Sequence, residues 1–558
     1  MTIGRVLVTQ NEPAKPYEFW CWLKDDPSLQ VEIGTVLVAE GNNGEKALAL
    51  VEDMKSTSAV SDHLLEFYGS GYGNPDITPP TQPALIRLAK LRVLYREPPS
   101  ASPPTGRWQV RFAQPKDVEL LAQRIPEQYR ILVGFLPGGA DQSNPANWLP
   151  VFAHAQFLLG PEAAHVNITG ATGLATKSSY ALFLSYAILA WAQRAEEKVA
   201  IVLFNVKRRD FLGLHQLPQD WDEANQWCQQ WAQSVGEPGL AESVLARWER
   251  AKQLGVDPIT FRFPVKYFTY QGDPDASFME APQIYRYGFD DLQIGDFEAA
   301  LFTTAYKPTD PQVILLTAYL DAKLGQGTSF QTMLDDLHRD NLTRRGNAVS
   351  VRGVPGDWMP EVPPALRRRV EGFLSRASHV VERRNPTGQP FRFDALEANG
   401  LHVVQLYRLS EEEKRLVVNA VIREISQGLE QQQSQPNRNI DRVVVIADEL
   451  NKYAPKGDMS PMKEQIIDIV ARGRDLQLTL IGAQQFASEV DEEVYGNSET
   501  KVVGYSDISE VNKEIYKYLG ALREQVPNLK KGQLILKHPI YPSPLIIWFP
   551  TPLHKMRP

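Results

Sequence analysis

The stretch HVNITGATGLATKSSYALFLSYAILAWA, from His165 to Ala192, decides the fold of this chain. A short β-rich run leads into a turn that contains glycine, and a long apolar run follows directly. A second β-rich run, AIVLFNVK, begins at Ala200. Strand, helix and strand at this spacing predict an α/β fold with a parallel sheet and crossover helices. The apolar run, which starts at Tyr180, is shorter than the ~20 residues that span a bilayer, so we expect a buried helix.

The turn between this strand and helix predicts a binding site for a nucleoside triphosphate. At such a turn the backbone N–H groups and the positive end of the helix face the phosphates, and a lysine neutralises the outer ones. Lys177 would contact the β- and γ-phosphates, and Ser178 would ligate Mg²⁺. We therefore assign nucleotide binding to the consecutive residues Gly170, Ala171, Thr172, Gly173, Leu174, Ala175, Thr176, Lys177, Ser178 and Ser179.

The loop departs from the standard spacing in two ways. Thr176 stands where a glycine normally precedes the lysine, and Gly170 lies seven instead of six positions before Lys177. The alternative interpretation is an ordinary glycine turn in front of a core helix.

An apolar strand that ends in two carboxylates supports the nucleotide site. The run VVVIADEL, from Val443 to Leu450, places Asp448 and Glu449 at its end. Adjacent carboxylates at the end of a buried strand are costly unless a cation meets them. We expect Asp448 to hold Mg²⁺ through water and Glu449 to act as base or orienter for the attacking water. The alternative is a strand end that emerges into solvent, where acidic residues are common.

Two further polar side chains are candidates for the same chemistry. The run LTLIGAQQ, from Leu478, is a buried strand whose tip carries Gln484, which can sense the γ-phosphate or merely cap the strand. The helix before this strand carries Arg472 and Arg474. A ring-forming ATPase needs an arginine that reaches the neighbouring subunit's phosphate, and we expect Arg474 in that role. A solvated helix surface is the alternative for both arginines.

The first hundred or so residues predict β structure. Short β-rich runs separated by turn residues, with no long helix, indicate a small barrel or sandwich. These runs begin at Gly4, Tyr17, Thr35, Lys46, Ile86 and Arg107. Between about residues 220 and 396 the pattern is mixed and mostly helical, and we interpret part of it as an insertion.

With these elements in this order, the chain resembles the HerA branch of the HerA–FtsK superfamily of hexameric DNA pumps. The matching segments are GRVLV and VEIGTVLVAE near the N-terminus, HVNITGATGLATKS, FNVKRRDFL, VVVIADELNKYAP and IVARGRDLQLTLIGAQQFASEV. The resemblance implies an N-terminal β-barrel at residues 1–112 and a RecA-like P-loop ATPase domain at residues 113–558, with the mostly helical insertion at about 220–396. It implies the roles given above for Lys177, Ser178, Asp448, Glu449, Gln484 and Arg474.

The resemblance further implies a homohexameric ring that binds ATP and Mg²⁺, hydrolyses ATP and drives double-stranded DNA through its centre as a translocase or helicase. It implies a NurA-type nuclease as partner and DNA repair by resection of broken ends. We expect a cytoplasmic location with no membrane attachment, because the N-terminal segment does not combine basic residues with an apolar run and no apolar run is long enough to span a bilayer. Two positions depart from the family pattern. Ala164 precedes His165 where the family often has a basic residue, and Lys207-Arg208-Arg209 stands where the family tends to be acidic or neutral.

The composition leaves other functions open. A net charge of −8 argues mildly against a protein that coats nucleic acid, although a ring can still have a basic channel. Cys21 and Cys228 form neither a metal-binding spacing nor a disulfide framework, and we expect buried thiols. A ring-forming scaffold or regulator that lacks hydrolysis, and a motor for a substrate other than DNA, are the alternative functions.

Overall fold

In the computed structural model the chain forms two compact units. The structure describes residues 1–26, 28–58, 85–138, 143–162, 164–171, 177–208, 210–234, 236–302, 307–435, 437–457, 459–551 and 553. The first unit consists of Met1–His154, Cys228–Val256 and Val503–Thr551, and the second of Ala155–Trp227, Asp257–Val502 and Pro552–Pro558. Residues 113–154, which the sequence places with the ATPase domain, thus group with the N-terminal strands.

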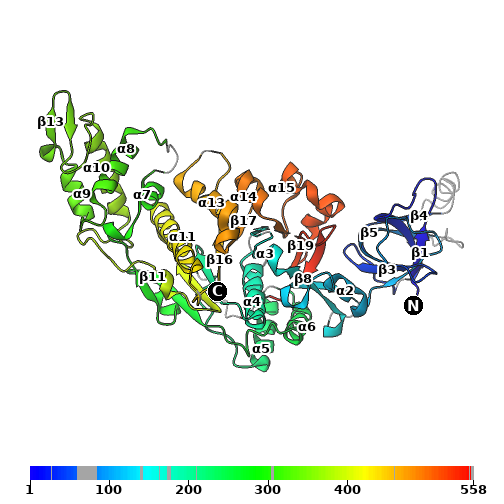
Figure 1. The fold of residues 1–558 in the computed structure, drawn as a ribbon. Helices are drawn as coiled ribbons and strands as arrows, with labels where there is room; N and C mark the ends of the chain where they lie inside the picture. Colours follow the sequence, from blue (N-terminus) through cyan, green and yellow to red (C-terminus); the bar gives the residue numbers. More distant parts are fainter. Residues whose placement is uncertain are drawn as a thin grey trace, which may run out of the picture. The chain divides into compact units, whose positions relative to one another are not determined.

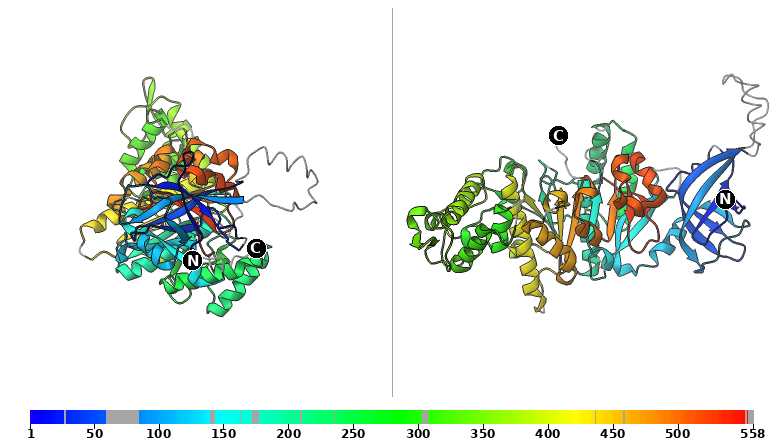
Figure 2. Two further views of the ribbon diagram at one scale, coloured as in Figure 1. Left: turned by 90° about the vertical axis from the view of Figure 1, so that its right-hand side faces the viewer. Right: turned by 90° about the horizontal axis from the view of Figure 1, so that it is seen from above.

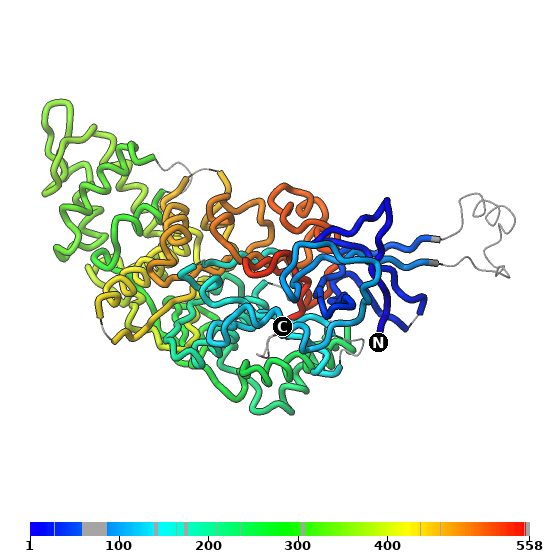
Figure 3. The backbone as a smooth tube through the Cα atoms, turned by 45° about the vertical axis from the view of Figure 1, so that its right-hand side comes forward, coloured from blue at the N-terminus to red at the C-terminus, as the bar shows by residue number. Residues whose placement is uncertain are grey.

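The first unit begins with a closed antiparallel β-barrel. Its strands are β1 (Gly4–Leu7), β2 (Glu18–Leu23), β3 (Val36–Glu40), β4 (Lys46–Ser58), β5 (Leu85–Glu97) and β6 (Gln109–Phe112), in the order β1-β2-β5-β4-β3-β6. Alternate residues of β2, namely Phe19, Cys21 and Leu23, are buried, as expected for a barrel wall. Figure 3 shows β4 and β5 running side by side. The predicted barrel is confirmed, and the sandwich alternative is excluded.

The first unit also contains four antiparallel strands that the sequence did not predict. They are β7 (Arg130–Pro137), β8 (Trp148–His154), β19 (Gln533–Lys537) and β20 (Leu545–Trp548), in the order β19-β20-β7-β8. Arg247, from helix α6 (Leu240–Gln253), is fully buried, with its guanidinium carbon 4.8 Å and 5.0 Å from the ring centroids of Trp148 and Trp548. Burial lowers the pKa of Arg247 to about 9, and the two indole faces offset part of its desolvation.

The second unit is built on a parallel sheet. Its strands are β12 (Gln283–Tyr285), β11 (Val265–Tyr270), β15 (Gly400–Gln405), β10 (Val199–Asn205), β16 (Arg442–Asp448), β17 (Leu478–Gln484), β9 (Val166–Thr169) and β18 (Thr500–Val503), given in their spatial order. The pairs from β12 to β9 are all parallel. The predicted α/β fold is therefore confirmed.

Crossover helices cover both faces of this sheet. Helix α4 (Lys177–Ala195) joins β9 to β10, whereas α11 (Glu411–Gln433) joins β15 to β16 and α13 (Pro461–Leu476) joins β16 to β17. From β9 to β10 the chain moves along the sheet toward β12. From β15 to β16, and from β16 to β17, it moves the opposite way, toward β9. Because such crossovers are right-handed, α4 lies on one face and α11 and α13 on the other (Figure 1). Residues 179–192 of α4 are all buried, and none of the described helices is long and apolar enough to cross a membrane.

The mostly helical segment packs against α11. Helices α7 (Ile294–Leu301), α8 (Pro311–Lys323), α9 (Phe330–Asp336) and α10 (Val362–Arg376) gather there (Figures 1 and 2). Their apolar side chains form one continuous core with α11, α13 and one face of the sheet. The predicted insertion is therefore too broad, since β11 and β12 extend the parallel sheet and α6 belongs to the first unit.

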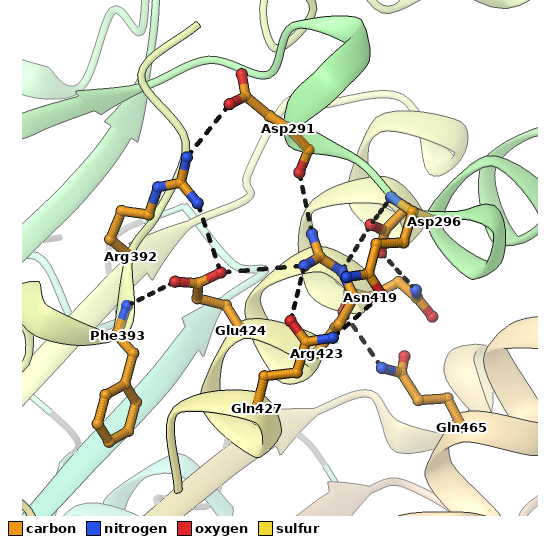
Figure 4. A network of polar contacts seen from close by, with 10 residues as sticks. Asp291, Asp296, Arg392, Phe393, Asn419, Arg423, Glu424, Gln427 and Gln465 are labelled. Carbon is orange, nitrogen blue, oxygen red and sulfur yellow. Dashed lines mark hydrogen bonds and ion pairs between the residues drawn. The ribbon is translucent and has the colours of Figure 1, made fainter. Parts of the chain in front are cut away.

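A buried polar network ties α7 to α11 (Figure 4). Asp296 of α7 is fully buried, and its carboxylate accepts hydrogen bonds from Arg423 at 2.8 Å and Asn419 at 2.7 Å, both from α11. Arg423 also donates to the backbone carbonyl of Asp291 at 3.1 Å. Burial raises the pKa of Asp296, and the charge of Arg423 opposes that rise. The helical segment thus depends on a buried ion pair for its orientation on α11.

We predict that Arg423→Met destabilises this junction by about 3–5 kcal/mol, because it leaves the Asp296 carboxylate buried without its cation. Hydrogen exchange monitored by mass spectrometry would show faster exchange in α7 and α11 in particular. The matched control is Arg376→Gln, which removes an arginine of α10 that is 55% exposed from its pair with Glu412 of α11, itself 27% exposed, and should cost at most about 1 kcal/mol. Equal effects of the two substitutions would contradict the assigned role of the pair.

Candidate functional site

The candidate site lies at the carboxyl edge of the parallel sheet in the second unit. Strands β16, β17 and β9 end level with one another, because Asp448 lies opposite Ala483 and Gln484 lies opposite Thr169. On the other side of β16, β10 ends at the same edge. Open α/β sheets bind ligands at the carboxyl ends of their strands. The strand order therefore brings together loops that are far apart in the sequence.

Lys177, the first residue of α4, is buried with 6% of its surface exposed. Burial lowers its pKa to about 8, and the nearby ammonium group of Lys207 adds to the shift, while Asp448, Glu449 and Asp210 oppose it. A desolvated ammonium at the positive end of a helix is unfavourable unless anions lie near it. The predicted lysine and the predicted carboxylates thus share one electrostatic environment that would favour an anionic ligand.

Asp448 and Ser178, the residues that the sequence assigns to Mg²⁺, both contact Lys207. Asp448 is only 3% exposed, and its carboxylate forms an ion pair with the Lys207 ammonium. The Lys207 Nζ lies 3.5 Å from the Ser178 hydroxyl oxygen and 3.9 Å from the Asp210 carboxylate. Ser178 in turn donates a hydrogen bond to Asp210 at 3.0 Å. The ammonium group of Lys207 is therefore held between the two predicted metal ligands.

Glu449 has a left-handed backbone conformation, with φ 60° and ψ 42°. Such a conformation costs a residue other than glycine about 1–3 kcal/mol and is found preferentially at functional sites. The Glu449 N–H donates to the side chain of Asp448 at 2.9 Å, and the Glu449 carboxylate lies 2.7 Å from the ammonium of Lys452. The side chain of Glu449 is 36% exposed, so water can reach the carboxylate.

Gln484 joins the tip of β17 to β9. Its side chain is 1% exposed, and its amide nitrogen donates to the Asn167 side chain at 2.6 Å and to the Thr169 hydroxyl at 3.2 Å. Its backbone carbonyl accepts a hydrogen bond from the N–H of Gly170 at 3.3 Å. Both amide hydrogens are thus used within the protein, and the backbone bond to Gly170 fixes where the chain leaves β9 toward the predicted nucleotide loop. Gln485, the next residue, is exposed.

Arg474 lies at the opposite end of β9 from Lys177. It is exposed on α13, donates to the carbonyl of Glu162 at 3.4 Å, and its charge acts on His165 at the start of β9. Burial is the main cause that lowers the pKa of His165 to about 4, and this side chain accepts a hydrogen bond from the N–H of Leu480 at 2.9 Å. His165 is therefore a packed, neutral residue, and Arg474 lies apart from Lys177 and the predicted nucleotide loop of its own chain.

Part of the predicted nucleotide loop lies outside the described residues, namely Thr172, Gly173, Leu174, Ala175 and Thr176. Gly170, Ala171, Ser178 and Ser179 are described, and Ser179 is buried in the first turn of α4.

Sequence reasoning missed the parts that Lys207 and Asp210 play. Lys207-Arg208-Arg209 stood out as a basic cluster, but nothing in the sequence says that β10 lies beside β16. A lysine two positions beyond a buried parallel strand was the available signal, because it must emerge at the same edge as Asp448. Arg208 is exposed, and Arg209 lies outside the described residues.

The side chains at this edge fit a magnesium–phosphate group better than a metal held by protein alone. Among the described residues no group of three His, Cys, Asp or Glu side chains could hold a metal ion. Ser178, Asp448 and Asp210 present hard oxygen donors, which Mg²⁺ prefers. Mg²⁺ is commonly bound through one or two carboxylates together with substrate phosphates, and Lys177 would neutralise those phosphates.

No protein-family model matches the chain, and no curated protein matches it. Among solved structures it is similar to the unbound bacterial conjugative coupling protein TrwBΔN70, with a TM-score of 0.44 and 10% identity over 80% of this chain and 94% of that chain. Plasmid coupling protein TrwB in complex with a non-hydrolysable ATP analogue has a TM-score of 0.42 and 11% identity, over 71% of this chain and 87% of that chain. The genome-packaging NTPase B204 of Sulfolobus turreted icosahedral virus 2, in complex with ATPγS, has a TM-score of 0.21 and 18% identity, over 26% of this chain and 67% of that chain.

We predict that Gln484→Met lowers the free energy of unfolding by about 1–3 kcal/mol, because it removes the donor to Asn167 and Thr169 in a buried position. Thermal unfolding followed by circular dichroism checks this. Gln485→Met, at the exposed neighbouring position, is the control and should leave the midpoint unchanged. If Gln484→Met unfolds at the wild-type temperature, the bonds to β9 contribute no stability, and a role at the phosphate would account better for this glutamine.

Proposed function

We propose that this chain is an ATP hydrolase that works as a ring and drives double-stranded DNA. The proposal rests on one observation. The buried Lys177 ammonium lies at the same edge of the sheet as Asp448 and Glu449, close enough for their charges to act on it. A cation at a helix N-terminus beside two carboxylates suits a triphosphate with its Mg²⁺.

In this proposal each side chain has a distinct task. Lys177 binds the β- and γ-phosphates, and residues 170–179 enclose them. Ser178 and Asp448 would hold Mg²⁺, which supplies charge neutralisation of the phosphates when it is bound. Glu449, whose carboxylate is partly exposed, orients or deprotonates the attacking water. Gln484 holds the start of the loop at Gly170 through its backbone carbonyl. As the sequence suggests, its side chain would sense the γ-phosphate.

The ring and its substrate rest on Arg474 and on the resemblance seen in the sequence. Arg474 lies away from the phosphate loop of its own chain, so its expected role requires a neighbouring subunit, and a closed homohexamer would supply one. We propose double-stranded DNA as the substrate, DNA end processing in repair as the context, and a NurA-type nuclease as the partner that cuts.

The central test is Mg²⁺-dependent ATP hydrolysis and its response to DNA. We predict that Lys177→Ala lowers turnover about a hundredfold or more, because the phosphates lose a preorganised cation. Glu449→Gln should abolish turnover and retain nucleotide binding. Double-stranded DNA should stimulate hydrolysis less as salt rises, since phosphate contacts release counterions.

Lys198→Ala is the matched control for this test, because Lys198 is exposed just before β10, at the amino edge of the sheet. It should hydrolyse ATP as the wild type does. Equal turnover of the Lys177→Ala and Lys198→Ala variants would rule out the proposed site, and a lack of DNA stimulation at low salt would count against DNA as the substrate.

Mixed rings test the role of Arg474. We predict that Arg474→Ala and Lys177→Ala subunits are each inactive alone but regain ATP hydrolysis when they are mixed, because some interfaces then combine an intact Lys177 with an intact Arg474. Arg472→Ala, which removes an arginine paired with Asp468 on the same helix, should be active by itself. No recovery in rings shown to be mixed would contradict action between subunits.

A ring-forming scaffold without hydrolysis is the second candidate, and specific contacts favour it. The Asp448 carboxylate is paired with Lys207, and that of Glu449 with Lys452, so both predicted catalytic carboxylates have protein cations beside them. Wild-type protein that binds ATP and assembles, yet shows no Mg²⁺-dependent turnover with or without DNA, would establish the scaffold in place of the motor.

A further inference from the structure

The position of Lys207 bears on how the proposed site binds its metal ion. Lys207 emerges from β10, the strand beside β16, and its ammonium forms an ion pair with the buried carboxylate of Asp448. The same ammonium lies 3.5 Å from the hydroxyl oxygen of Ser178. A metal ion that contacted Ser178 and approached Asp448 would have to lie where this ammonium lies. Two cations cannot share that position, because their repulsion at such a distance is large in a partly buried site.

A second carboxylate lies within reach of the same lysine. Asp210, three positions further along the chain, is 3.9 Å from the Lys207 Nζ and accepts a hydrogen bond from Ser178. The Lys207 side chain is 28% exposed and carries a flexible stem, so its ammonium can move without unfolding the turn. Asp210 is exposed to 39% and can accept the ammonium at a lower desolvation cost than Asp448.

We propose that Lys207 and the divalent cation are alternative partners of Asp448. The ammonium of Lys207 neutralises Asp448 until nucleotide arrives with Mg²⁺, and it then moves to Asp210 while the metal takes its place. This proposal rests on the nucleotide site proposed above. Its consequence is that the protein without nucleotide binds divalent metal weakly, since the phosphates must contribute to the displacement of the lysine. Lys207 is thus a positioning residue that makes metal binding depend on nucleotide.

If the Lys207–Asp448 pair had a purely structural role, loss of Lys207 would change metal binding in the opposite direction. If Lys207 only held Asp448 in place, its loss would disorder the carboxylate and weaken any metal bound there. If it competes with the metal, its loss removes a positive charge from the site and strengthens metal binding. The sign of the change therefore separates the two roles.

The experiment uses the full-length chain and Mn²⁺ as the probe, with free Mn²⁺ followed by electron paramagnetic resonance in the absence of nucleotide. Lys207→Met should bind Mn²⁺ on the order of tenfold more tightly than the wild type, because one unit charge next to the metal is gone. Arg208→Met is the matched control, since it removes a neighbouring exposed charge, and it should bind Mn²⁺ as the wild type does. Asp210→Asn, which removes the second partner of the lysine, should weaken Mg²⁺-dependent binding of a fluorescent ATP analogue.

Each outcome decides the inference. Mn²⁺ binding by Lys207→Met that equals or falls below the wild-type affinity, with analogue binding intact, would overturn the inference and leave the proposed function standing. Failure of the wild type itself to bind the analogue would overturn the proposed function and the inference with it. If Lys207→Met does not fold, Lys207→Gln decides, because it removes the same charge and keeps a polar side chain: Mn²⁺ binding no tighter than in the wild type would overturn the inference.

Discussion

The second unit depends on how buried charge is balanced at the carboxyl edge of its parallel sheet. Lys177 is desolvated at the positive end of α4, and Asp448 is desolvated at the end of β16. Neither group is tolerable alone in such surroundings, and each is close enough to affect the other. Lys207, Asp210 and Ser178 complete the balance with an ion pair and hydrogen bonds. The strand order matters because it is what brings these groups to one edge.

The rest of the second unit supports that edge. Gln484 holds the end of β17 to β9, and α4 packs its apolar sides beneath the site. On the other face, α11 and α13 share a core with the helical segment, which the buried pair of Asp296 and Arg423 fixes to α11. A rigid sheet with helices on both faces can hold charged groups in place without help from a ligand. The predicted nucleotide loop thus follows the well-packed strand β9 and precedes the well-packed helix α4.

Much of this could be predicted from the sequence, and the failures have physical causes. Apolar runs that end in Asp448 and in Gln484 identify buried parallel strands, and the short β-rich runs of the first hundred residues indicate a small barrel or sandwich. The antiparallel strands of the first unit were missed. Pro150 lies inside β8, which is at the end of its sheet, and a register shift between Leu132 and Gly134 interrupts β7. A proline or a glycine inside a run is a signal against a regular strand.

The ion pair between Lys207 and Asp448 could not be predicted for a different reason. It depends on which strands are neighbours, and sequence order does not give that. The same holds for the bonds of Gln484 to Asn167 and Thr169, which come from a pairing between distant segments. Sequence periodicity shows which face of a helix or strand is buried. It does not show which helices and strands are neighbours, and these contacts depend on that. The sequence therefore indicated which side chains lie at this edge, but not the contacts among them.

The most direct measurement is an experimental structure with Mn²⁺ and a non-hydrolysable ATP analogue, in which anomalous scattering locates the metal. The account predicts the metal beside Ser178 and Asp448, and the γ-phosphate at the Lys177 ammonium. A nucleotide bound elsewhere, or one bound here with the metal remote from Asp448, would contradict it.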